Sequence, residues 1–335
     1  MGQTGVGKTS LLKALFNKAL FNQQMDRNIL VDDVRPATRQ PGTYTIVGEN
    51  GQILKINDLP GIGESQSTDQ YLLDTYELYF QPSDLVLWAI QADKRSTAFD
   101  AQSLGNLLGR LDEQAQEKFM SKMVFVLTKV DTLLPSPWIM AYNNPSVWFT
   151  PGQETLELIK KKQEFFQEQL IQPFGSHIIS RTHNDVNFKL DPPFGSDEKK
   201  VTYRGLLTRK LVEELSVTYR QYQEVFKRLY DNYCPVPCSA RFKYNLPQLM
   251  LVILNKLGSG AVQNFKRVVD PDRLGIMSLD EARQLCNLLI WNTPDARKIF
   301  DLEEGRFPEP KRDSVFYKKM EQQHKGLFGV FGRRK

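Results

Sequence analysis

Short apolar runs alternate with amphipathic stretches along the chain. The runs at 53–56, 84–90 and 124–127 have the length of strands buried in a sheet, whereas 71–79 and 246–257 carry apolar residues at helical spacing. Strands that alternate with helices are typical of a mostly parallel sheet with helices on both faces. The pattern therefore predicts an α/β fold built as a three-layer sandwich.

Composition narrows the class of protein. The chain has 335 residues, of which 41% are hydrophobic and 25% charged, as in ordinary globular proteins. No run approaches the ~18 apolar residues of a transmembrane helix, and the first residues do not read as a secretory signal. The net charge of +5 is too mild to establish nucleic-acid binding. We expect a cytoplasmic protein.

The cysteine pattern does not indicate a metal site. Cys234, Cys238 and Cys286 are the only cysteines, and no histidine stands near them in the sequence, so the spacing of a zinc site is missing. Cys234 and Cys238 stand around two prolines. We expect reduced, partly buried thiols, as is usual in a cytosolic protein.

The start of the chain carries a phosphate-binding pattern. Residues 2–10 read GQTGVGKTS, which has the Walker A spacing of glycines, lysine and hydroxyl residue. The glycines let successive backbone N–H groups point at phosphate, Lys8 reaches the β- and γ-phosphates, and Thr9 ligates Mg²⁺. A helix follows, and its positive end faces the anion. We predict nucleotide contacts from Gln3, Thr4, Gly5, Val6, Gly7, Lys8, Thr9 and Ser10, with Lys8 also catalytic.

The strand that normally precedes such a loop is missing from the pattern. A P-loop joins a buried parallel strand to a helix, but only Met1 stands before Gly2. Without that strand, its neighbours in the sheet lose hydrogen-bond partners on both sides. We therefore expect a P-loop NTPase fold whose first strand is absent, and a longer form of the chain that carries an apolar strand upstream.

Two further segments have the groups that Mg²⁺ and a γ-phosphate require. Asp58 and Gly61 form a DxxG pattern after a strand, so the carboxylate can hold Mg²⁺ and the Gly61 N–H can meet the γ-phosphate. The polar stretch 35–43 is typical of a switch loop, which needs a threonine for Mg²⁺. We choose Thr38, with Thr43 and Thr45 as rivals. The predicted metal ligands are Thr9, Thr38 and Asp58, and Thr38 and Gly61 join Lys8 as catalytic groups.

Two later motifs resemble those by which GTPases bind guanine. Thr128, Lys129 and Asp131 follow the third apolar run and resemble the Asn/Thr-Lys-x-Asp motif of translation-factor-class GTPases. A carboxylate at Asp131 accepts from guanine N1–H and its amino group, a pattern that adenine lacks. By the same resemblance, the Lys129 stem lies over the base and Thr128 ties its loop to the P-loop. Ser239 and Ala240 resemble the last motif, in which the alanine N–H meets guanine O6.

These motifs together resemble the Era-like branch of the TRAFAC-class P-loop GTPases. The likeness is closest to the bacterial YfjP-like GTPases and more distant to the immunity-related GTPases. It rests also on the stretch 58–64, DLPGIGE, and on Trp138 with the Pro-Ser pair after it, and it covers 2–165 and 234–257. The resemblance implies binding of GTP and GDP with Mg²⁺, and slow hydrolysis of GTP to GDP and phosphate.

A water-orienting residue is harder to find. Many GTPases place a glutamine after the DxxG glycine, but Ile62 stands here, and an apolar side chain cannot orient water. Glu64, Gln66 and Gln40 are near only in sequence. We therefore expect a slow regulatory switch. The alternatives are GTP-controlled self-assembly with incidental hydrolysis, a P-loop ATPase or kinase, and a truncated form that folds poorly.

The two guanine motifs stand far apart, which indicates an insertion between them. Helical periodicity at 154–169 and 206–230 predicts two helices that pack as a hairpin, with a polar loop at 184–200. The expected parts are a GTP-binding domain at 1–165 and 233–257, a mostly helical insertion at 166–232, a helical C-terminal region at 258–317 and a tail at 318–335.

The C-terminal part carries no chemical motif. Apolar spacing predicts helices at 279–292 and 294–300, the first capped by Ser278 with Glu281 three residues on. The tail interleaves apolar residues and glycine with lysine and arginine. It is a candidate contact for ribosomal RNA or an anionic membrane surface, the latter with a peripheral membrane location, against the alternative of a disordered end. Self-association is the other partner that we consider.

Overall fold

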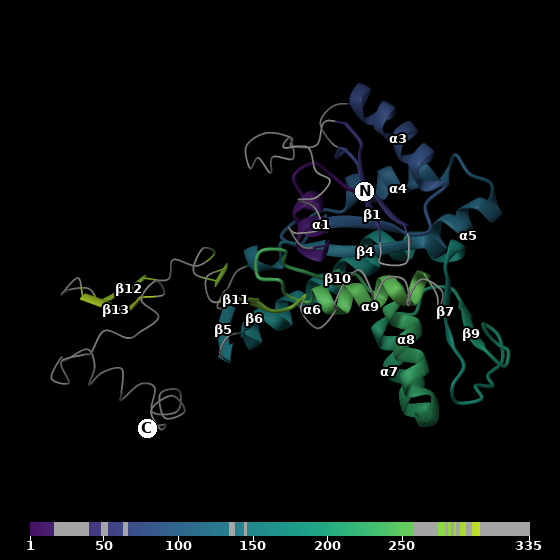
Figure 1. Cartoon of the computed structure of the whole chain (residues 1–335). Helices are drawn as coiled ribbons and strands as arrows, with labels where there is room; N and C mark the ends of the chain where they lie inside the picture. The colour runs from purple at the N-terminus through teal and green to yellow at the C-terminus, as the bar shows by residue number, and fades with distance from the viewer. Residues whose placement is uncertain are drawn as a thin grey trace. The chain divides into compact units, whose positions relative to one another are not determined.

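Figure 1 shows the computed structural model of the chain. It describes residues 1–16, 40–47, 53–62, 66–133, 138–143, 146–257, 274–278, 281–282, 285, 289–292 and 297–301. The chain divides into two compact units, Met1–Tyr142 with Trp148–Ile276 and Asn143–Val147 with Met277–Lys335. None of the helices in the described ranges is long and apolar enough to cross a membrane.

A parallel sheet forms the centre of the first unit. β3 (Val86–Gln91) and β10 (Val236–Pro237) lie on either side of β4 (Met123–Thr128), and both run parallel to it. Every residue of β4 is buried, as its apolar sequence requires of a strand covered on both faces. β1 (Gly42–Val47) and β2 (Ile53–Asp58) form an antiparallel hairpin. The predicted parallel sheet is therefore present.

Residues at the start of the chain connect these two groups of strands. Gly2 forms a parallel bridge with Ala89 of β3, and Gln3 forms one with Ile62, just beyond β2. The Ala89 N–H donates to Met1 O at 3.0 Å, and the Ile62 N–H donates to Gly2 O at 3.3 Å. Met1–Gln3 thus lie where the first strand was expected, between β3 and the end of the hairpin, and they supply part of its hydrogen bonding.

Alternate side chains of the sheet build apolar cores on its two faces. Phe125 and Leu127 belong to one cluster, and Val124 and Val126 belong to the other, as the two-residue period of a strand dictates. The first cluster includes residues of α3 (Gln66–Phe80), α4 (Ala98–Leu108), α5 (Glu113–Lys122) and α6 (Gln153–Phe166). The second includes residues of α1 (Lys8–Phe16) and α9 (Leu246–Leu257). Helices therefore cover both faces of the sheet, as expected (Figure 1).

The insertion at 166–232 differs from the mostly helical prediction. It begins with two short helical segments, η2 (Gln167–Ile171) and η3 (Gln172–His177). An antiparallel sheet follows, in the order β7-β9-β8, formed by β7 (Ile179–His183), β8 (Phe194–Ser196) and β9 (Lys200–Arg204). The stretch 206–230 is not one helix but three pieces, α7 (Arg209–Thr218), η4 (Arg220–Tyr222) and α8 (Gln223–Asp231).

A third apolar cluster explains this difference. Phe188, Tyr203 and Phe226 come from the loop, the sheet and α8 and pack together, so the insertion has a small core of its own. The helical period of 206–230 breaks at Tyr219, whose φ of −125° and ψ of 67° are not helical. The predicted hairpin of two helices is not formed as such. α7 packs on α8 within this cluster, and it meets the helix at 154–169 through the Arg209–Glu164 ion pair.

A short hairpin and the second unit complete the fold. β5 (Trp138–Asn143) and β6 (Ser146–Pro151) follow the third apolar run. In the second unit, β11 (Met277–Ser278) pairs antiparallel with Val147 and Ser146. The Glu281 N–H donates to Ser278 Oγ at 3.2 Å and Glu281 Oε2 accepts from the Ser278 N–H at 3.0 Å. This capping box confirms the predicted helix start.

Beyond this cap, the described residues 281–282 and 285 are helical, as predicted, but 289–292 and 297–300 are not. β12 (Leu289–Asn292) and β13 (Arg297–Asp301) pair as antiparallel strands. Short apolar runs on either side of a Thr-Pro pair suit a hairpin as well as a helix, and periodicity cannot separate the two at this length. The tail at 318–335 and the stretch 258–273 lie outside the described residues.

Candidate nucleotide-binding site

The predicted phosphate loop connects Met1–Gln3 to the first turn of α1. Gly5 and Gly7 have φ of 76° and 89°, a left-handed conformation that glycine adopts without steric penalty. A Cβ placed on Gly5 would meet no atom within 4 Å, so the loop is open on that side. The Leu11 N–H donates to Gly7 O at 2.9 Å, which starts the helix directly at the loop, as an anion-binding helix N-terminus requires.

The charged and hydroxyl groups of the motif converge on this loop. Lys8 Nζ donates to Gln3 O at 2.8 Å and to Gly2 O at 3.2 Å, so its side chain folds back along the loop. Thr9 Oγ1 donates to Asp58 Oδ2 at 2.5 Å, and Asp58 is buried. A hydroxyl and a carboxylate are oxygen ligands of the kind that Mg²⁺ prefers. The residues present therefore fit the cation that the motif implies.

Gly61 packs directly onto the phosphate loop. A Cβ at this position would lie 2.3 Å from both Thr4 N and Thr4 Cα, so only glycine fits. The Thr4 N–H donates to Ile62 O at 3.0 Å, which holds the two loops together. The DxxG segment and the P-loop, separated by the whole β1–β2 hairpin in the sequence, are thus neighbours in the fold.

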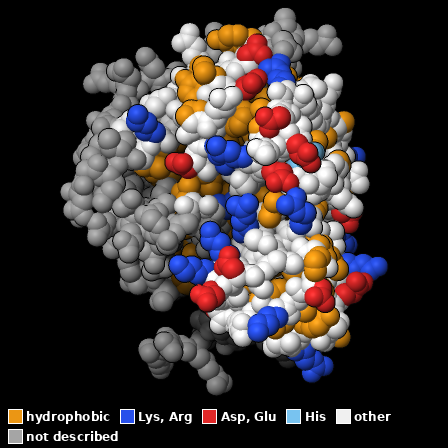
Figure 2. All heavy atoms as spheres, turned by 90° about the vertical axis from the view of Figure 1, so that its right-hand side faces the viewer, with side chains coloured by type: hydrophobic (Ala, Val, Ile, Leu, Met, Phe, Trp, Pro, Cys, Tyr) orange, Lys and Arg blue, Asp and Glu red, His pale blue; other side chains and the backbone are white. Residues whose placement is uncertain are grey.

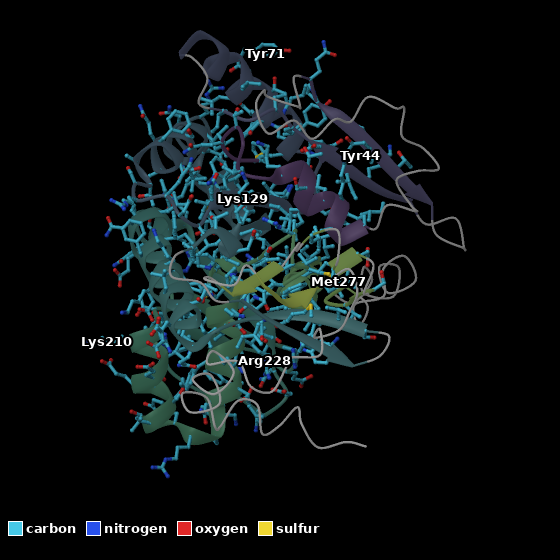
Figure 3. The ribbon with its side chains drawn as sticks, turned by 90° about the vertical axis from the view of Figure 1, so that its left-hand side faces the viewer. Tyr44, Tyr71, Lys129, Lys210, Arg228 and Met277 are labelled. Carbon is cyan, nitrogen blue, oxygen red and sulfur yellow. The ribbon has the colours of Figure 1, made fainter. Side chains whose placement is uncertain are left out.

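The first predicted base motif is tied to the phosphate loop as well. Thr128 Oγ1 lies 2.5 Å from Val6 O and 3.1 Å from Ile90 O. Lys129, labelled in Figure 3, has a left-handed φ of 55°. Its Cε lies 3.6 Å from the position that a Cβ on Gly7 would take. The stem of Lys129 therefore runs beside the loop that would hold the phosphates.

The last predicted motif lies beside the first base motif. The Cys238 N–H donates to Leu127 O at 2.7 Å, and the Val130 N–H donates to Cys238 O at 3.3 Å. Ser239 is fully buried, and its Oγ accepts from the Phe242 N–H at 3.0 Å, which shapes the loop that carries Ala240. The insertion thus separates the two motifs in the sequence, but parallel pairing of β4 and β10 brings them together.

Only two of the three candidate switch threonines lie among the described residues. Thr38, our choice for the Mg²⁺ shell, lies outside the described residues. Thr43 and Thr45 both belong to β1, and Thr43 Oγ1 donates to Asn57 Oδ1 at 2.8 Å across the hairpin. Among the water-orienting candidates, Glu64 also lies outside the described residues, whereas Gln40 is exposed.

Sequence reasoning missed a buried carboxylate behind the P-loop. Asp100 of α4 accepts from Gln3 Nε2 at 2.6 Å and from Trp88 Nε1 at 3.2 Å, and Lys94 Nζ donates to Gln3 Oε1. Burial raises the pKa of Asp100 and lowers the pKa of Lys94. The Gln3 side chain therefore turns toward α4, while its carbonyl faces Lys8. One sequence signal could have found this carboxylate. Asp100 stands four residues before Leu104, so the two share the apolar face of α4.

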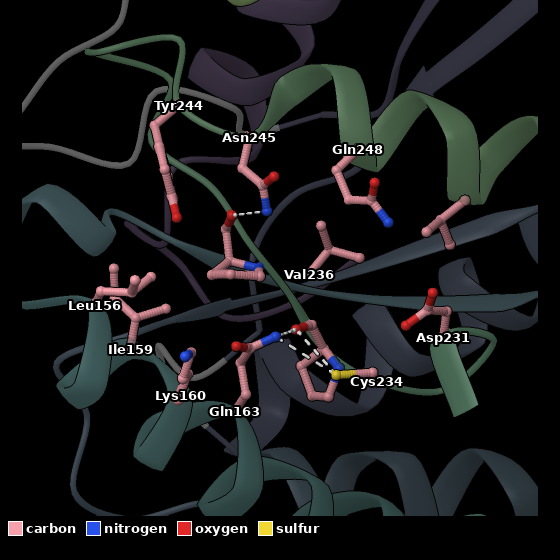
Figure 4. Close-up of a pocket in the computed structure, with 13 residues that line it drawn as sticks. Leu156, Ile159, Lys160, Gln163, Asp231, Cys234, Val236, Tyr244, Asn245 and Gln248 are labelled. Atoms are coloured by element: carbon pink, nitrogen blue, oxygen red, sulfur yellow. Dashed lines mark hydrogen bonds between the residues drawn. The ribbon is translucent and has the colours of Figure 1, made fainter. Parts of the chain in front are cut away.

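A separate pocket of about 180 Å³ lies outside the nucleotide motifs, at the outer edge of β10 (Figure 4). Gln163 Nε2 donates to Pro235 O and Asn245 Nδ2 donates to Pro237 O, both at 3.0 Å. Proline has no N–H, so neither Pro235 nor Pro237 offers a backbone donor at this edge, and the two amides occupy their carbonyl acceptors. Cys234 also lines this pocket, and burial raises its pKa to about 12. Among the described residues Cys234 and Cys238 are free, Cys234 half-buried and Cys238 fully buried, whereas Cys286 lies outside the described residues.

Comparison with known proteins agrees with these motifs. Residues 1–129 match the family described as 50S ribosome-binding GTPase. The Escherichia coli K12 proteins YfjP and YkfA are each 34% identical to the chain over 137 residues, which are 41% of this chain and 42% of each relative. The match thus spans less than half the length of these curated relatives. Among solved structures, Toc33 from Arabidopsis thaliana covers 77% of this chain and 82% of its own at 13% identity, with a TM-score of 0.41.

Proposed function

We propose that the chain binds GTP and GDP with Mg²⁺ and hydrolyses GTP slowly as a regulatory switch. The premise is that residues 1–129 form a P-loop GTPase domain related to that of YfjP. The observation that carries this proposal is the bond from Thr128 Oγ1 to Val6 O at 2.5 Å. It joins the loop predicted to read the base to the loop predicted to hold the phosphates, and a nucleotide has to contact both.

Each predicted group then has a defined task. Lys8 and the N–H groups of the P-loop balance phosphate charge, which is the main contribution of a protein to phosphoryl transfer. Thr9 and Asp58 supply oxygens to Mg²⁺, which neutralises charge on the phosphates when it is bound. Asp131 accepts from guanine, and Lys129 covers the base face. Thr38 completes the metal shell.

Slow turnover follows from what stands beside the DxxG glycine. Ile62 is 1% exposed, and its N–H and C=O bond to Gly2 and Thr4 of the P-loop. An apolar, fully packed side chain cannot orient an attacking water. We therefore expect intrinsic hydrolysis near the slow end for GTPases that lack a catalytic partner, on the order of 10⁻³ per second.

The test of the base assignment exploits hydrogen-bond chemistry at Asp131. An asparagine there keeps an acceptor for N1–H but places an NH₂ donor against the guanine amino group, whereas xanthine has a carbonyl at that position. Asp131→Asn should therefore lose about 100-fold in GTP affinity and gain affinity for xanthosine triphosphate, measured by competition against a fluorescent GDP. Asp84→Asn is the matched control, because Asp84 is exposed before β3.

Two outcomes would contradict the proposal. If ATP displaces labelled GDP from the wild-type protein as well as GTP does, the chain is a P-loop ATPase or kinase. If Asp131→Asn keeps the wild-type preference for GTP over xanthosine triphosphate, the base contact is elsewhere. The alternative of self-assembly predicts a hydrolysis rate per molecule that rises with protein concentration, together with light scattering on addition of GTP.

The charge distribution gives no support to a broad nucleic-acid contact on the face that Figure 2 shows. Lysine and arginine side chains there are interspersed with aspartate and glutamate. The described residues include ion pairs such as Arg110–Asp74 and Arg204–Glu117, which join the two signs. A contact with ribosomal RNA or an anionic membrane would therefore have to use another part of the chain, and the tail at 318–335 is the segment that we propose for it.

A further inference from the structure

Tyr76 joins α3 to both loops that would hold the γ-phosphate. Its side chain is fully buried, and its ring meets the Trp88 ring edge to face, with centroids 6.4 Å apart. The Gly2 N–H donates to Tyr76 Oη at 3.2 Å. Tyr76 Oη also lies 2.8 Å from Pro60 O and 3.1 Å from Gly2 O. One hydroxyl thus meets the first P-loop glycine and the DxxG segment.

The single proton of this hydroxyl can be assigned from the neighbours of its two acceptors. Gly2 O already accepts from Lys8 Nζ and from the Ile62 N–H, whereas Pro60 O is the nearer of the two oxygens. The better arrangement of donors therefore has Tyr76 donate to Pro60 O and accept from the Gly2 N–H. In this arrangement the hydroxyl uses both its donor and an acceptor position.

The planarity of the peptide bond connects this hydrogen bond to the direction of the Gly61 N–H. The carbonyl of Pro60 and the N–H of Gly61 belong to one rigid unit and point in opposite directions. A donor that holds Pro60 O therefore also sets the direction of the Gly61 N–H. A Cβ on Gly61 would lie 2.3 Å from Thr4 of the P-loop, so this peptide is already beside the phosphate loop.

We propose that Tyr76 is a positioning residue that aims the Gly61 N–H at the γ-phosphate, so that the protein distinguishes GTP from GDP. This inference rests on the proposed function, in which Gly61 meets the γ-phosphate. Tyr76 acts only through the Gly61 peptide and touches no nucleotide. It also ties the position of α3 to the nucleotide state, because the same hydroxyl belongs to that helix.

The test compares two nucleotides and two matched variants. Tyr76→Phe removes the hydroxyl and keeps the ring. Tyr233→Phe removes another buried hydroxyl, whose Oη donates to Met120 O at 3.1 Å away from the nucleotide motifs. The dissociation constants of GDP and of a non-hydrolysable GTP analogue are measured with Mg²⁺. We expect Tyr76→Phe to weaken the GTP analogue about tenfold while GDP changes less than about twofold. Tyr233→Phe should leave the ratio of the two constants unchanged.

Each other outcome has a distinct meaning. An unchanged ratio in Tyr76→Phe, or an equal loss for both nucleotides, would overturn the positioning role. If wild-type protein binds neither nucleotide, the proposed function itself fails. If Tyr76→Phe does not fold, wild-type protein with ¹³C at the tyrosine ζ carbon replaces the variant. The Tyr76 resonance should then shift between GDP and the GTP analogue, and coincident resonances would refute the proposal.

Discussion

The Thr128 hydroxyl lies 2.5 Å from the carbonyl oxygen of Val6, on the P-loop, and 3.1 Å from that of Ile90 in β3. Thr128 is 3% exposed, so water does not replace this donor readily. Valine has nearly the same shape as threonine but no hydroxyl, so Thr128→Val leaves the two carbonyls without this donor. The lost hydrogen bonds cost roughly 1–3 kcal/mol of stability. We expect GDP affinity to fall about tenfold, measured by fluorescent-nucleotide titration. Thr128→Ser keeps the hydroxyl and should bind nearly as the wild type does, and equal affinity of Val and Ser variants would contradict this role.

The Thr9–Asp58 pair predicts a nucleotide interaction that depends on Mg²⁺. Because Thr9 Oγ1 and Asp58 Oδ2 are 2.5 Å apart, a bound cation can use both oxygens. Thr9→Val should lower the affinity for Mg²⁺ with GDP about tenfold or more, whereas Thr9→Ser should preserve it. Thermal melts with GDP, in Mg²⁺ and in EDTA, separate the metal-dependent shift. A full Mg²⁺-dependent shift in Thr9→Val would remove Thr9 from the metal site.

The close packing of Gly61 predicts that one added methyl group lowers stability and hydrolysis. An alanine Cβ would lie 2.3 Å from Thr4 N, so the DxxG segment has to move away from the P-loop. We expect Gly61→Ala to lower the free energy of unfolding by about 1–3 kcal/mol and to abolish GTP hydrolysis. Gly105→Ala is the control. Gly105 lies within α4, and a Cβ there would be 3.9 Å from the Phe174 ring, an ordinary contact distance.

The control has an expected sign of its own. Alanine is favoured over glycine within a helix, so Gly105→Ala should raise the free energy of unfolding by about 0.5–1 kcal/mol. Urea denaturation measures both variants. If Gly61→Ala is as stable as the wild type and hydrolyses GTP normally, the close packing of Gly61 on Thr4 is wrong.

Lys256 predicts a pH dependence of stability. Its ammonium lies 3.8 Å from the centre of the Tyr233 ring, and burial, with a smaller effect of the Arg181 charge, lowers the pKa of Lys256 to about 7. The unfolded chain keeps the ordinary pKa of 10.5. Between these two pH values the unfolded chain binds a proton that the folded protein lacks, so the free energy of unfolding contributed by this group rises with pH.

Replacing Lys256 by methionine isolates this effect. Lys256→Met should be more stable than the wild type at pH 7, by roughly 2 kcal/mol, and its advantage should shrink as the pH rises to 10. Lys210→Met is the control, because the Lys210 side chain is 88% exposed (Figure 3) and should show no such trend. Urea denaturation at both pH values checks this, and an advantage that is equal at pH 7 and pH 10 would contradict the lowered pKa.

Strongly periodic elements could be predicted from the sequence, and short ones could not. The helix at 246–257 was predicted at the bounds that α9 has, because its apolar spacing runs through three turns. The pairs β12–β13 and β7–β9 have strands of four or five residues, too short for a period to distinguish strand from helix. Pairing with the partner strand decided their conformation.

The sequence by itself determined the chemistry of each motif, because the spacing from Gly2 to Thr9 and from Thr128 to Asp131 reflects local backbone geometry that nearby residues set. Only the tertiary structure decided which side chains support those motifs. Tyr76 meets Gly2 across a separation of 74 residues, and Asp100 meets Gln3 across 97. Such contacts depend on how α3 and α4 pack against the sheet, and the local pattern around either residue does not encode that packing.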